Sequence, residues 1–362
     1  MKTHVLIVGP LPPPMHGSAR VTREMSQRIG ESCRTRVCDT NAQPGTGLAY
    51  HLTRIRSYVL AAWVMVTMTR PGRRRVLYIG GSGGLGLWYE VVLVALARLL
   101  GWRIAFHHHS YRYLRQPRRA MAAFVRASGP RALHLVLCAG MRDRLRDLYP
   151  TASNAIVLSN AIFVGIEPGA GERRDGPGET TRPLRFSHVS NLSFGKGLDV
   201  VLQSVDACLE AGLDVELDLA GPVSGDEEKQ LLQSHLERHG SRIHHVGPIA
   251  NDEVVAFLAR SDYFLFPSRY KHEAEPLVVL EAMAAGVPAL MTDVGCARAL
   301  AVAGLPPLPD AETFRTSVVS LAHDGREGTQ LDELRRQTSD HLIELQGQST
   351  AALADFRAWL EG

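Results

Sequence analysis

Two glutamates, Glu273 and Glu281, stand eight positions apart in the stretch KHEAEPLVVLEAMAAGVP (271–288). Pro276, between them, favours a helix start, because the first turn of a helix does not need the amide proton that proline lacks. The residues around Glu281 are apolar on nearly every side, which predicts a buried helix. A buried carboxylate must be paired or hydrogen-bonded. Glu281 is therefore predicted either to bind a ligand or to join an internal network, while Glu273 lies near the positive end of the helix dipole.

Two further loops place anion-binding groups after expected strands. In HVSNLSFGKGLDVVLQ (188–203), Lys196 stands between two glycines and opens a helix. A lysine at a helix start is well placed for a phosphate, although a solvated lysine is the simpler alternative. In GPLPPPMHGSARVTREM (9–25), Gly17 begins a helix after a proline-stiffened loop. This loop predicts a second anion-binding helix end, with a plain connecting loop as the alternative.

The segment GGSGGLG (80–86) matches the G-x-G-x-x-G pattern of dinucleotide-binding proteins. That fingerprint also requires an acidic residue about 20 residues further on, where this chain has His107, His108 and His109. The sequence therefore disfavours a nicotinamide cofactor and predicts a glycine-lined wall. Alternation along a strand sends His107 and His109 to one face and His108 to the other, and one histidine is expected to bind substrate. Metal ligation is the weaker alternative, because no carboxylate or cysteine lies near them in the sequence.

The elements that must position these residues alternate between strand-like and helix-like patterns, which is typical of doubly wound α/β domains. The alternation occurs once before the stretch 167–183, a linker rich in Gly, Pro and charge, and once after it. We expect an N-terminal domain (1–166), the linker, a second domain (184–345) and a C-terminal helix (346–362) that packs back on the first domain. Open α/β sheets bind ligands beyond the carboxyl ends of their strands, so two such sheets face to face would form a cleft.

The composition fits a folded, soluble protein of two domains. The chain has 362 residues, of which 45% are hydrophobic and 21% charged. No apolar run approaches the about 18 residues of a membrane-spanning helix, and the N-terminal apolar run is too short for a signal peptide. The five cysteines form no C-x-x-C pair, which favours a reducing, cytoplasmic setting.

Charge is distributed unevenly along the chain. Residues 1–166 contain 23 Lys and Arg against 6 Asp and Glu, whereas the remainder contains 17 against 31. The first half is therefore expected to face something anionic, a membrane surface or nucleic acid, unless the two halves attract each other. Within the first half, residues 57–69 form an uncharged, mostly apolar run with arginines on both sides. Its length predicts an interfacial helix that lies on a membrane, or alternatively a buried helix of the sheet domain.

These motifs together resemble the retaining glycosyltransferases of family 4, which have the GT-B fold, with two Rossmann-like doubly wound domains facing across a cleft. HEAEPLVVLEAMAAGVPAL resembles the E-x7-E signature of that family, and NLSFGKGLDVVLQ resembles its phosphate-binding lysine loop. LDLAGP, HHVGPIANDEVVAFLARSDYFLFPSRY, VLSNAI and GPLPPPMHGSA are similar to its other familiar stretches. The likeness extends from residue 4 to about residue 300.

The resemblance implies a role for each candidate residue. Glu281 would bind the ribose hydroxyls of a nucleotide sugar, and Glu273 would hold hydroxyls of the donor sugar. Lys196 would neutralise the charge that grows on the departing diphosphate, and His109 would lie beside the sugar and the acceptor. The expected catalytic group is His109, Lys196 and Glu273. The other donor-binding residues are expected to be Gly17, Asn191, Gly247, Ile249, Pro276, Leu277 and Val278, and the acceptor side to include His107, His108 and Arg112.

Two positions depart from the family pattern. An arginine is usual five positions before the lysine, where this chain has Asn191, so the missing cation is expected to come from elsewhere, such as Arg20 or Arg269. Arg298 stands where the family often has an acid. Both changes affect the expected donor pocket more than the expected reaction class.

The predicted function is that of a retaining, nucleotide-sugar-dependent hexosyltransferase or related glycosyltransferase. Its acceptor is expected to be a glycan or a lipid-diphosphate-linked sugar, in bacterial surface polysaccharide or glycolipid synthesis. No D-x-D-like metal motif is evident, so no metal or other cofactor is expected. The protein is expected to be cytoplasmic, as a peripheral protein on the inner face of the membrane.

Two alternatives remain open at the level of the sequence. One is a sugar-nucleotide epimerase of similar fold, and the other is a non-catalytic protein that binds anionic lipid or glycan. A nucleic-acid partner is not expected, because no recognisable nucleic-acid-binding module accompanies the basic residues.

Overall fold

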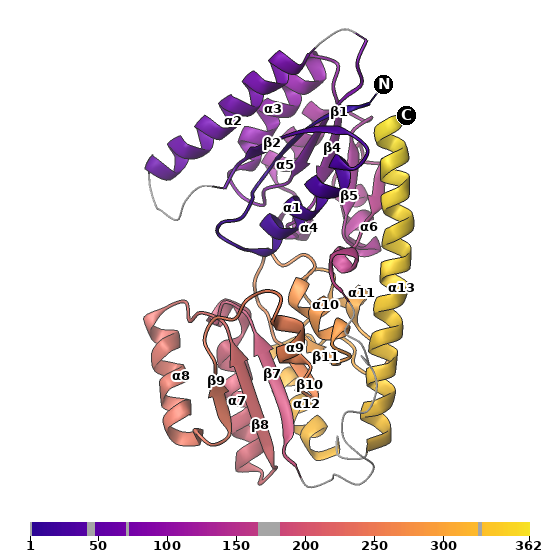
Figure 1. Cartoon of the computed structure of the whole chain (residues 1–362). Helices are drawn as coiled ribbons and strands as arrows, with labels where there is room; N and C mark the ends of the chain where they lie inside the picture. The colour runs from indigo at the N-terminus through magenta and orange to yellow at the C-terminus, as the bar shows by residue number, and fades with distance from the viewer. Residues whose placement is uncertain (1, 42–47, 70–71, 166–181, 325–327) are drawn as a thin grey trace. The chain divides into compact units, whose positions relative to one another are not determined.

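The chain folds into two compact units. The computed structural model describes residues 2–41, 48–69, 72–165, 182–324 and 328–362 (Figure 1). The first unit comprises Met1–Phe163 and Gly347–Gly362, and the second comprises Val164–Gln346. Most of the predicted linker, 167–183, lies outside the described residues.

The first domain is built on a parallel sheet, whose strands within the described residues are in the order β2-β1-β3-β4-β5-β6. These strands are β1 (His4–Gly9), β2 (Arg34–Asp39), β3 (Arg75–Gly80), β4 (Arg103–His107), β5 (Leu133–Val136) and β6 (Ala155–Val157). The helices are α1 (Gly17–Gly30), α2 (Leu48–Met68), α3 (Leu87–Leu99), α4 (Arg112–Arg115), α5 (Arg119–Ser128) and α6 (Ala139–Leu148), followed by the 3₁₀ helix η1 (Asn160–Phe163). All strand pairs are parallel, so the carboxyl ends of the strands share one edge.

Continuous apolar runs account for the inner strands of this sheet. In β1 the segment VLIV is fully buried, as expected for a parallel strand that helices cover on both faces. The same pattern identifies β3, β4 and β5 from the sequence. It misses β2, an edge strand with the sequence RTRVCD in which Cys38 is the buried residue, and β6, which has three residues.

The chain ends in one long helix, α13 (Gly328–Glu361). The sequence predicts a separate C-terminal helix over 346–362, whereas in the structure this segment continues the helix that begins at Gly328. Gly347 lies at the predicted break, but a single glycine costs a helix only about 1 kcal/mol. Buried side chains on both sides of Gly347 outweigh that cost.

The last turns of α13 belong to the first domain. Phe356 and Leu360 are fully buried, and the Phe356 ring centroid is 6.2 Å from that of Tyr78 in β3. The hydroxyl of Thr3 donates to the carbonyl of Leu360 at 3.0 Å. The C-terminal residues are therefore part of the core that supports β3.

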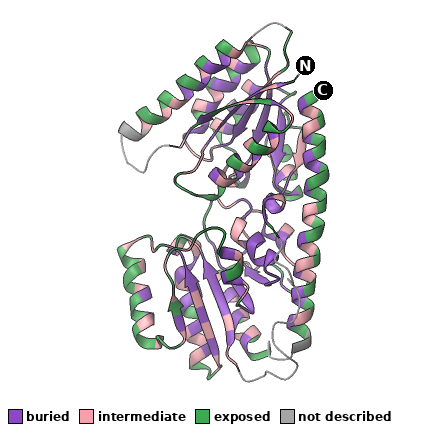
Figure 2. Ribbon diagram, in the orientation of Figure 1, coloured by how far each residue is buried: buried purple, intermediate pink, exposed green. Residues whose placement is uncertain are grey.

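The second domain has a parallel sheet in which the described strands are in the order β11-β10-β7-β8-β9. The strands are β7 (Leu184–Val189), β8 (Val215–Ala220), β9 (Ile243–His245), β10 (Tyr263–Phe266) and β11 (Ala289–Met291). The helices that precede α13 are η2 (Phe194–Lys196), α7 (Leu198–Glu210), α8 (Asp226–His239), α9 (Val254–Leu258), α10 (Leu277–Ala284), α11 (Ala297–Leu300) and α12 (Ala311–Asp324). Figure 2 shows that the strands of both sheets are largely buried.

A buried ionic network lies at the amino ends of these strands, away from their ligand-binding ends. Asp262, just before β10, accepts hydrogen bonds from Arg182 at 2.8 and 2.9 Å and from Arg335 of α13 at 2.8 Å. The backbone N–H of Arg185 in β7 donates to the same carboxylate at 2.9 Å. The network thus joins β7, β10 and α13.

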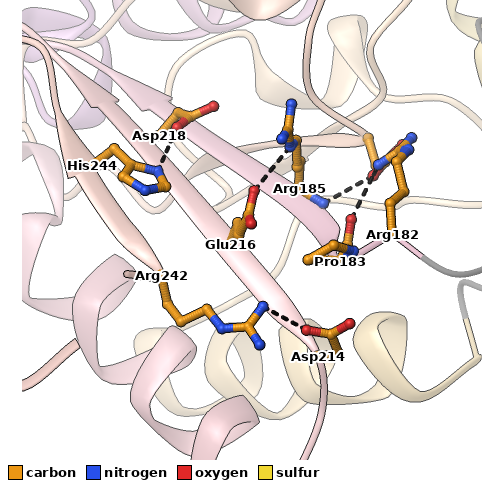
Figure 3. A network of polar contacts seen from close by, with 9 residues as sticks. Arg182, Pro183, Arg185, Asp214, Glu216, Asp218, Arg242 and His244 are labelled. Carbon is orange, nitrogen blue, oxygen red and sulfur yellow. Dashed lines mark hydrogen bonds and ion pairs between the residues drawn. The ribbon is translucent and has the colours of Figure 1, made fainter. Parts of the chain in front are cut away.

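More exposed pairs follow the neighbouring strands, as Figure 3 shows. They are Arg185 with Glu216 at 3.0 Å, His244 with Asp218 at 3.2 Å and Arg242 with Asp214 at 2.5 Å. Partly exposed pairs of this kind each contribute about 1 kcal/mol or less. The charges at this end of the sheet therefore stabilise the scaffold, and the chemistry must be sought at the opposite end.

Candidate functional site

The winding of the second sheet reverses between β7 and β10. The chain passes from β7 to β8 and β9 on one side and later returns to β10 on the other side of β7. Open α/β sheets bind ligands at the carboxyl ends of the strands where the winding reverses. Here those ends continue into residues 190–196 and 267–273.

Lys196 and Glu273 meet at this point. The ammonium group of Lys196 contacts Oε2 of Glu273, and the hydroxyl of Ser268 donates to the same oxygen at 3.2 Å. The side chain of Lys196 is 25% exposed and that of Glu273 is 11% exposed. Lys196 is therefore held in place by a carboxylate while its charge remains accessible to a ligand.

Gly197 permits the close approach of the two loops. Its φ of +86° is in the left-handed region, and a Cβ there would lie 2.3 Å from the carbonyl oxygen of Pro267. A residue with a side chain at position 197 would push the lysine loop away from the β10 loop. Ser268, which follows Pro267, was not singled out from the sequence, because its role depends on this packing.

Arg269 strengthens the same contact and is itself neutralised. Its backbone N–H donates to the carbonyl of Gly195 at 2.9 Å, and its guanidinium pairs with Asp199 at 2.6 Å. Arg20, the other arginine considered as a substitute cation, donates to the carbonyl of Phe163 at 3.4 Å in the first domain. Asn191, where the family usually has an arginine, is exposed.

The helix α10 begins beside Glu273. Pro276 precedes it in an extended conformation, with no side chain capping the helix. Val279 donates its N–H to the carbonyl of Pro276 at 3.1 Å, whereas the N–H groups of Leu277 and Val278 precede the first helical hydrogen bond. Both residues are half-buried, so this helix start has the orientation and partial positive charge that suit a phosphate.

Glu281 is buried within α10, with 5% of its surface exposed. Side chains of a helix tilt toward its amino end, so the Glu281 carboxylate leans toward the turn that contains Leu277 and Val278. Glu275 is also buried, at 6% exposed. No sequence pattern singles out Glu275.

The segment after β11 supports Glu273 from behind. Gly295 has a φ of +56°, and a Cβ there would lie 2.6 Å from the carbonyl oxygen of Glu273 and 2.2 Å from that of Ala274. The N–H of Cys296 donates to the carbonyl of Ala274 at 2.7 Å. A glycine is thus required at position 295 for this segment to approach Glu273 so closely. In the sequence, the glycine itself is the only sign of this role. Arg298, the departure noted nearby, pairs with Asp293 on the surface.

The carboxyl ends of β8 and β9 converge on Gly221 and Gly247. The N–H of Gly221 donates to the carbonyl of Gly247 at 2.8 Å, and a Cβ on Gly221 would lie 1.8 Å from the carbonyl oxygen of Ser190. Open space surrounds the Cβ position of Gly247, and Ile249 is half-buried nearby in the chain. These residues form the β8–β9 side of the same strand ends.

His188 shapes the turn after β7 without adding charge. Burial lowers the pKa of its imidazole to about 4, with the charge of Lys196 as a smaller cause. The neutral ring donates from Nδ1 to the carbonyl of Leu265 at 2.8 Å and accepts at Nε2 from the hydroxyl of Ser190 at 2.9 Å. His188 therefore fixes the loop that leads to Lys196.

In the first domain, the alternation predicted for the three histidines after β4 is observed. The rings of His107 and His109 lie 4.3 Å apart, and Nδ1 of His107 is 2.7 Å from the hydroxyl of Tyr78. The Nε2 atoms of His107 and His109 have no hydrogen-bond partner within the described part of the chain. His109 is half-buried, and burial together with the charge of His16 lowers its pKa to about 4. It is neutral at pH 7 and lies within electrostatic range of the start of α1.

His108 faces the other side of the sheet. Its ring nitrogens lie 2.9 Å from the hydroxyl of Tyr113 and 3.0 Å from Nδ1 of His134. Burial lowers the pKa of His108 well below its usual value. Both nitrogens are thus used inside the domain, on the face opposite to His107 and His109.

The two remaining first-domain candidates lie at helix starts. Gly17 is the first residue of α1 and is exposed, and Nδ1 of the preceding His16 accepts from the N–H of Ala19 at 3.3 Å. Arg112 is the first residue of α4, and its N–H donates to the hydroxyl of Ser110 at 3.3 Å. Arg112 therefore follows the histidine strand end directly.

The GGSGGLG loop packs closely against β4 at Gly81. A Cβ on Gly81 would lie 2.1 Å from the ring of Phe106. The loop is fastened by the buried Glu90 of α3, which accepts from the N–H of Ser82 at 2.9 Å and from the hydroxyl of Tyr58 at 3.2 Å. The close contact with Phe106 gives a structural reason for the glycine at position 81.

The described residues contain no group of three or more His, Cys, Asp or Glu side chains arranged to hold a metal ion. Within the same residues, no helix has the length and hydropathy needed to cross a membrane.

This chain is similar to known glycosyl transferases. A family model described as glycosyl transferases group 1 matches residues 172–309, which contain Lys196, Glu273 and Glu281. The solved structure of HepE from Anabaena in complex with UDP is similar, with a TM-score of 0.66 and 15% identity, covering 98% of this chain and 100% of that one. The fold is GT-B. The predicted fold class, with two Rossmann-like parallel-sheet domains, is therefore confirmed.

Two other solved GT-B structures extend the comparison. Sucrose-phosphate synthase from Thermosynechococcus elongatus has a TM-score of 0.68 and 14% identity, covering 99% of each chain. The pneumococcal O-GlcNAc transferase GtfA in complex with UDP and GlcNAc has a TM-score of 0.62 and 12% identity, covering 83% of this chain and 59% of that one. A search of curated proteins gave no match. The identities are low, so these likenesses establish the fold.

Proposed function

We propose that this protein is a retaining glycosyltransferase of the family 4 type that moves a sugar from a nucleotide-sugar donor to a hydroxyl of a glycan or lipid-linked acceptor. The observation that carries the proposal is the Lys196–Glu273 pair beside the start of α10, at the strand ends where the sheet reverses its winding. This pair lies inside the segment that matches the group 1 glycosyl transferases. Bacterial surface polysaccharide or glycolipid synthesis, on the cytoplasmic side of the membrane, is the proposed setting.

We infer from the chemistry of its strand ends that the second domain binds the donor. The N–H groups of Leu277 and Val278 would bind the diphosphate together with Lys196. Glu281, which leans toward the same turn, would accept hydrogen bonds from the ribose hydroxyls. The base would lie near Gly247 and Ile249. Solved structures of similar fold contain UDP, which makes uridine the first base to test.

The reaction then needs stabilisation of a leaving group more than a protein nucleophile. The bond between the anomeric carbon and the diphosphate oxygen breaks while the acceptor oxygen attacks from the same face. The acceptor proton passes to the departing diphosphate, and the products are the glycoside and the nucleoside diphosphate. Lys196 opposes the negative charge that develops on the diphosphate. Glu273 would hold the donor sugar through its hydroxyls, and neutral His109 would bind a hydroxyl of the sugar or acceptor.

Lys196 and the start of α10 supply positive charge where a divalent ion would otherwise bind the diphosphate. We therefore propose that catalysis requires no metal ion. Turnover in the presence of EDTA should equal turnover with added Mg²⁺.

The first experiment is a thermal-shift panel of UDP-, GDP-, ADP- and dTDP-sugars on wild type, Glu281→Gln and the control Glu227→Ala. A ligand that binds only the folded state raises its melting temperature by mass action. Glu227 is an exposed acid on α8, so its variant should respond like wild type. We expect one nucleotide class to raise the melting temperature of wild type and control but not of Glu281→Gln.

The same samples separate the proposal from its alternatives. Absence of any shift in well-folded wild type would argue for a non-catalytic binder. Conversion of the bound nucleotide sugar into its epimer without an acceptor would identify an epimerase. The expected result is transfer of the sugar to an acceptor with the anomeric configuration preserved, which NMR can measure.

A further inference from the structure

The helices α2 and α3 pack against each other on the first domain through their inner faces. The rings of Tyr58 and Tyr89 are 5.4 Å apart, and the Tyr58 hydroxyl donates to Glu90 at 3.2 Å. Ala61 and Met65, on the same face of α2 as Tyr58, are fully buried. One face of α2 is therefore part of the core of the first domain. The sequence allowed either a buried helix or an interfacial helix, and this inner face fits the buried helix.

Figure 2 shows exposed residues on the outer faces of both helices, and many of these residues are apolar. On α2 the exposed apolar residues at 52, 55, 59, 63 and 66 recur every three or four positions, which places them on one stripe, and Leu60 directly follows Val59. They are Leu52 (55%), Ile55 (42%), Val59 (62%), Leu60 (51%), Trp63 (62%) and Val66 (51%). Leu85 before α3, and Trp88, Val92 and Leu99 on it, are 72%, 46%, 71% and 83% exposed. We call these ten residues the α2–α3 stripe.

The charge around the α2–α3 stripe has one sign. From residue 48 to residue 99, which includes both helices, the sequence contains seven arginines and a single acidic residue, Glu90. Glu90 is fully buried and faces inward. Arg56 near the start of α2 and Arg73 shortly after its end are exposed. The surface around the stripe therefore offers cations and apolar side chains without an exposed carboxylate on either helix.

We propose that the α2–α3 stripe binds the surface of an anionic lipid bilayer, with Trp63 and Trp88 in the headgroup region and the arginines on lipid phosphates. The uncharged section of α2, residues 57–69, has 13 residues and a length of about 20 Å. A bilayer core is about 30 Å thick, so α2 lies along the surface. This arrangement is typical of interfacial helices with a basic rim.

A bilayer fits these observations better than a second copy of the chain. Two copies that paired through this face would bring arginines toward arginines, with no exposed acid on α2 or α3 to neutralise them. An anionic membrane matches both the apolar and the cationic parts. The inference rests on the α2–α3 stripe alone and holds whether or not the protein transfers sugar.

The test is cosedimentation with vesicles of phosphatidylcholine alone and of phosphatidylcholine with phosphatidylglycerol. Wild type should bind the anionic vesicles, and the binding should weaken as salt increases. Val59→Asp with Trp63→Asp should weaken it by about tenfold or more, because both side chains would have to enter the headgroup region. Ile343→Asp is the matched control, since Ile343 is 55% exposed on α13 in the second domain, and it should bind like wild type.

A milder variant guards against misfolding. Brominated lipids in the anionic vesicles should quench the fluorescence of wild type more than that of Trp63→Phe, which keeps an aromatic side chain at this position. Equal quenching of the two proteins, or no binding by wild type, would overturn the proposal. So would a wild-type dimer that the Asp substitutions convert to monomer while vesicle binding is absent, because the stripe would then be a contact between copies.

Discussion

The ammonium group of Lys196 and the carboxylate of Glu273 form an ion pair although 77 residues separate them in the sequence. The sheet order brings them together, since β7 and β10 are neighbours while β8 and β9 lie between them in the chain. Ser268 donates to the same carboxylate oxygen. A diphosphate that binds Lys196 must therefore share the ammonium charge of this lysine with Glu273. This shared contact links the position of the leaving group to that of the donor sugar.

Replacing Lys196 should slow the reaction far more than it weakens the fold. If the lysine stabilises charge on the departing diphosphate, Lys196→Ala should lower kcat by about 10²–10³-fold. Its ion pair is partly exposed, so the melting temperature should fall by only a few degrees. Initial rates of nucleoside diphosphate release, with the donor base found in the thermal-shift panel, measure the effect.

Lys271 provides the matched control for this variant. It is an exposed lysine on the same loop as Glu273, so Lys271→Ala removes an equal charge without touching the pair. Lys196→Arg should keep more activity than Lys196→Ala, because it preserves the charge. Equal kcat values for Lys196→Ala and wild type would remove Lys196 from the mechanism.

The fold was predictable because its inner strands are continuous apolar runs. The segment VLIV in β1 is typical of a short parallel strand that is buried on both faces. The edge strand β2 escaped prediction because RTRVCD has one buried residue. The continuous α13 escaped it because a glycine at position 347 suggests a break that tertiary packing overrides.

Some residues of the candidate site could likewise be predicted from the sequence, and others could not. Lys196 and Glu273 could be singled out because each stands beside a helix start that the sequence marks with Gly or Pro, and Glu281 because it is a carboxylate within an apolar helix. Ser268 and Gly295 were not, because their importance lies in contacts between loops that follow different strands. Gly295 matters through the carbonyl oxygens of Glu273 and Ala274, and no local pattern records that distance.

Asp262 should be a major determinant of the stability of the second domain. Its side chain is 2% exposed and pairs with Arg335, which is 6% exposed, and with Arg182. Asp262→Asn keeps the shape but leaves a buried guanidinium without its counter-charge, which should cost about 3–5 kcal/mol. For a domain of this size the melting temperature should fall by about 10 °C.

Asp214→Asn is the appropriate comparison. Asp214 pairs with Arg242, but the two side chains are 36% and 38% exposed (Figure 3). Removing a surface pair costs about 1 kcal/mol or less, so its melting curve should stay close to that of wild type. If the two variants melt at the same temperature, burial does not determine the strength of these pairs.

Glu90 should make the first domain less stable as the pH rises through the range in which it ionises. Burial raises the pKa of this carboxyl to about 7, and the hydrogen bond from Ser82 opposes the rise only in part. In the unfolded chain Glu90 titrates near its ordinary pKa of about 4.3. Between these two values the folded state binds more protons than the unfolded state, so stability decreases with increasing pH and levels off above about pH 7. The total change attributable to Glu90 is about 4 kcal/mol.

Comparison with Glu90→Gln isolates this effect from the buried histidines. His109 and His134 have pKa values lowered to about 4 by burial, so they act in the opposite direction and destabilise the fold as the pH falls below about 6.5. They are present in both proteins and cancel in the difference. Glutamine resembles the protonated acid, so the melting temperature of Glu90→Gln relative to wild type should rise by about 6–10 °C from pH 5 to pH 8. If the two melting curves stay parallel across that range, the pKa of Glu90 is not raised in the folded protein.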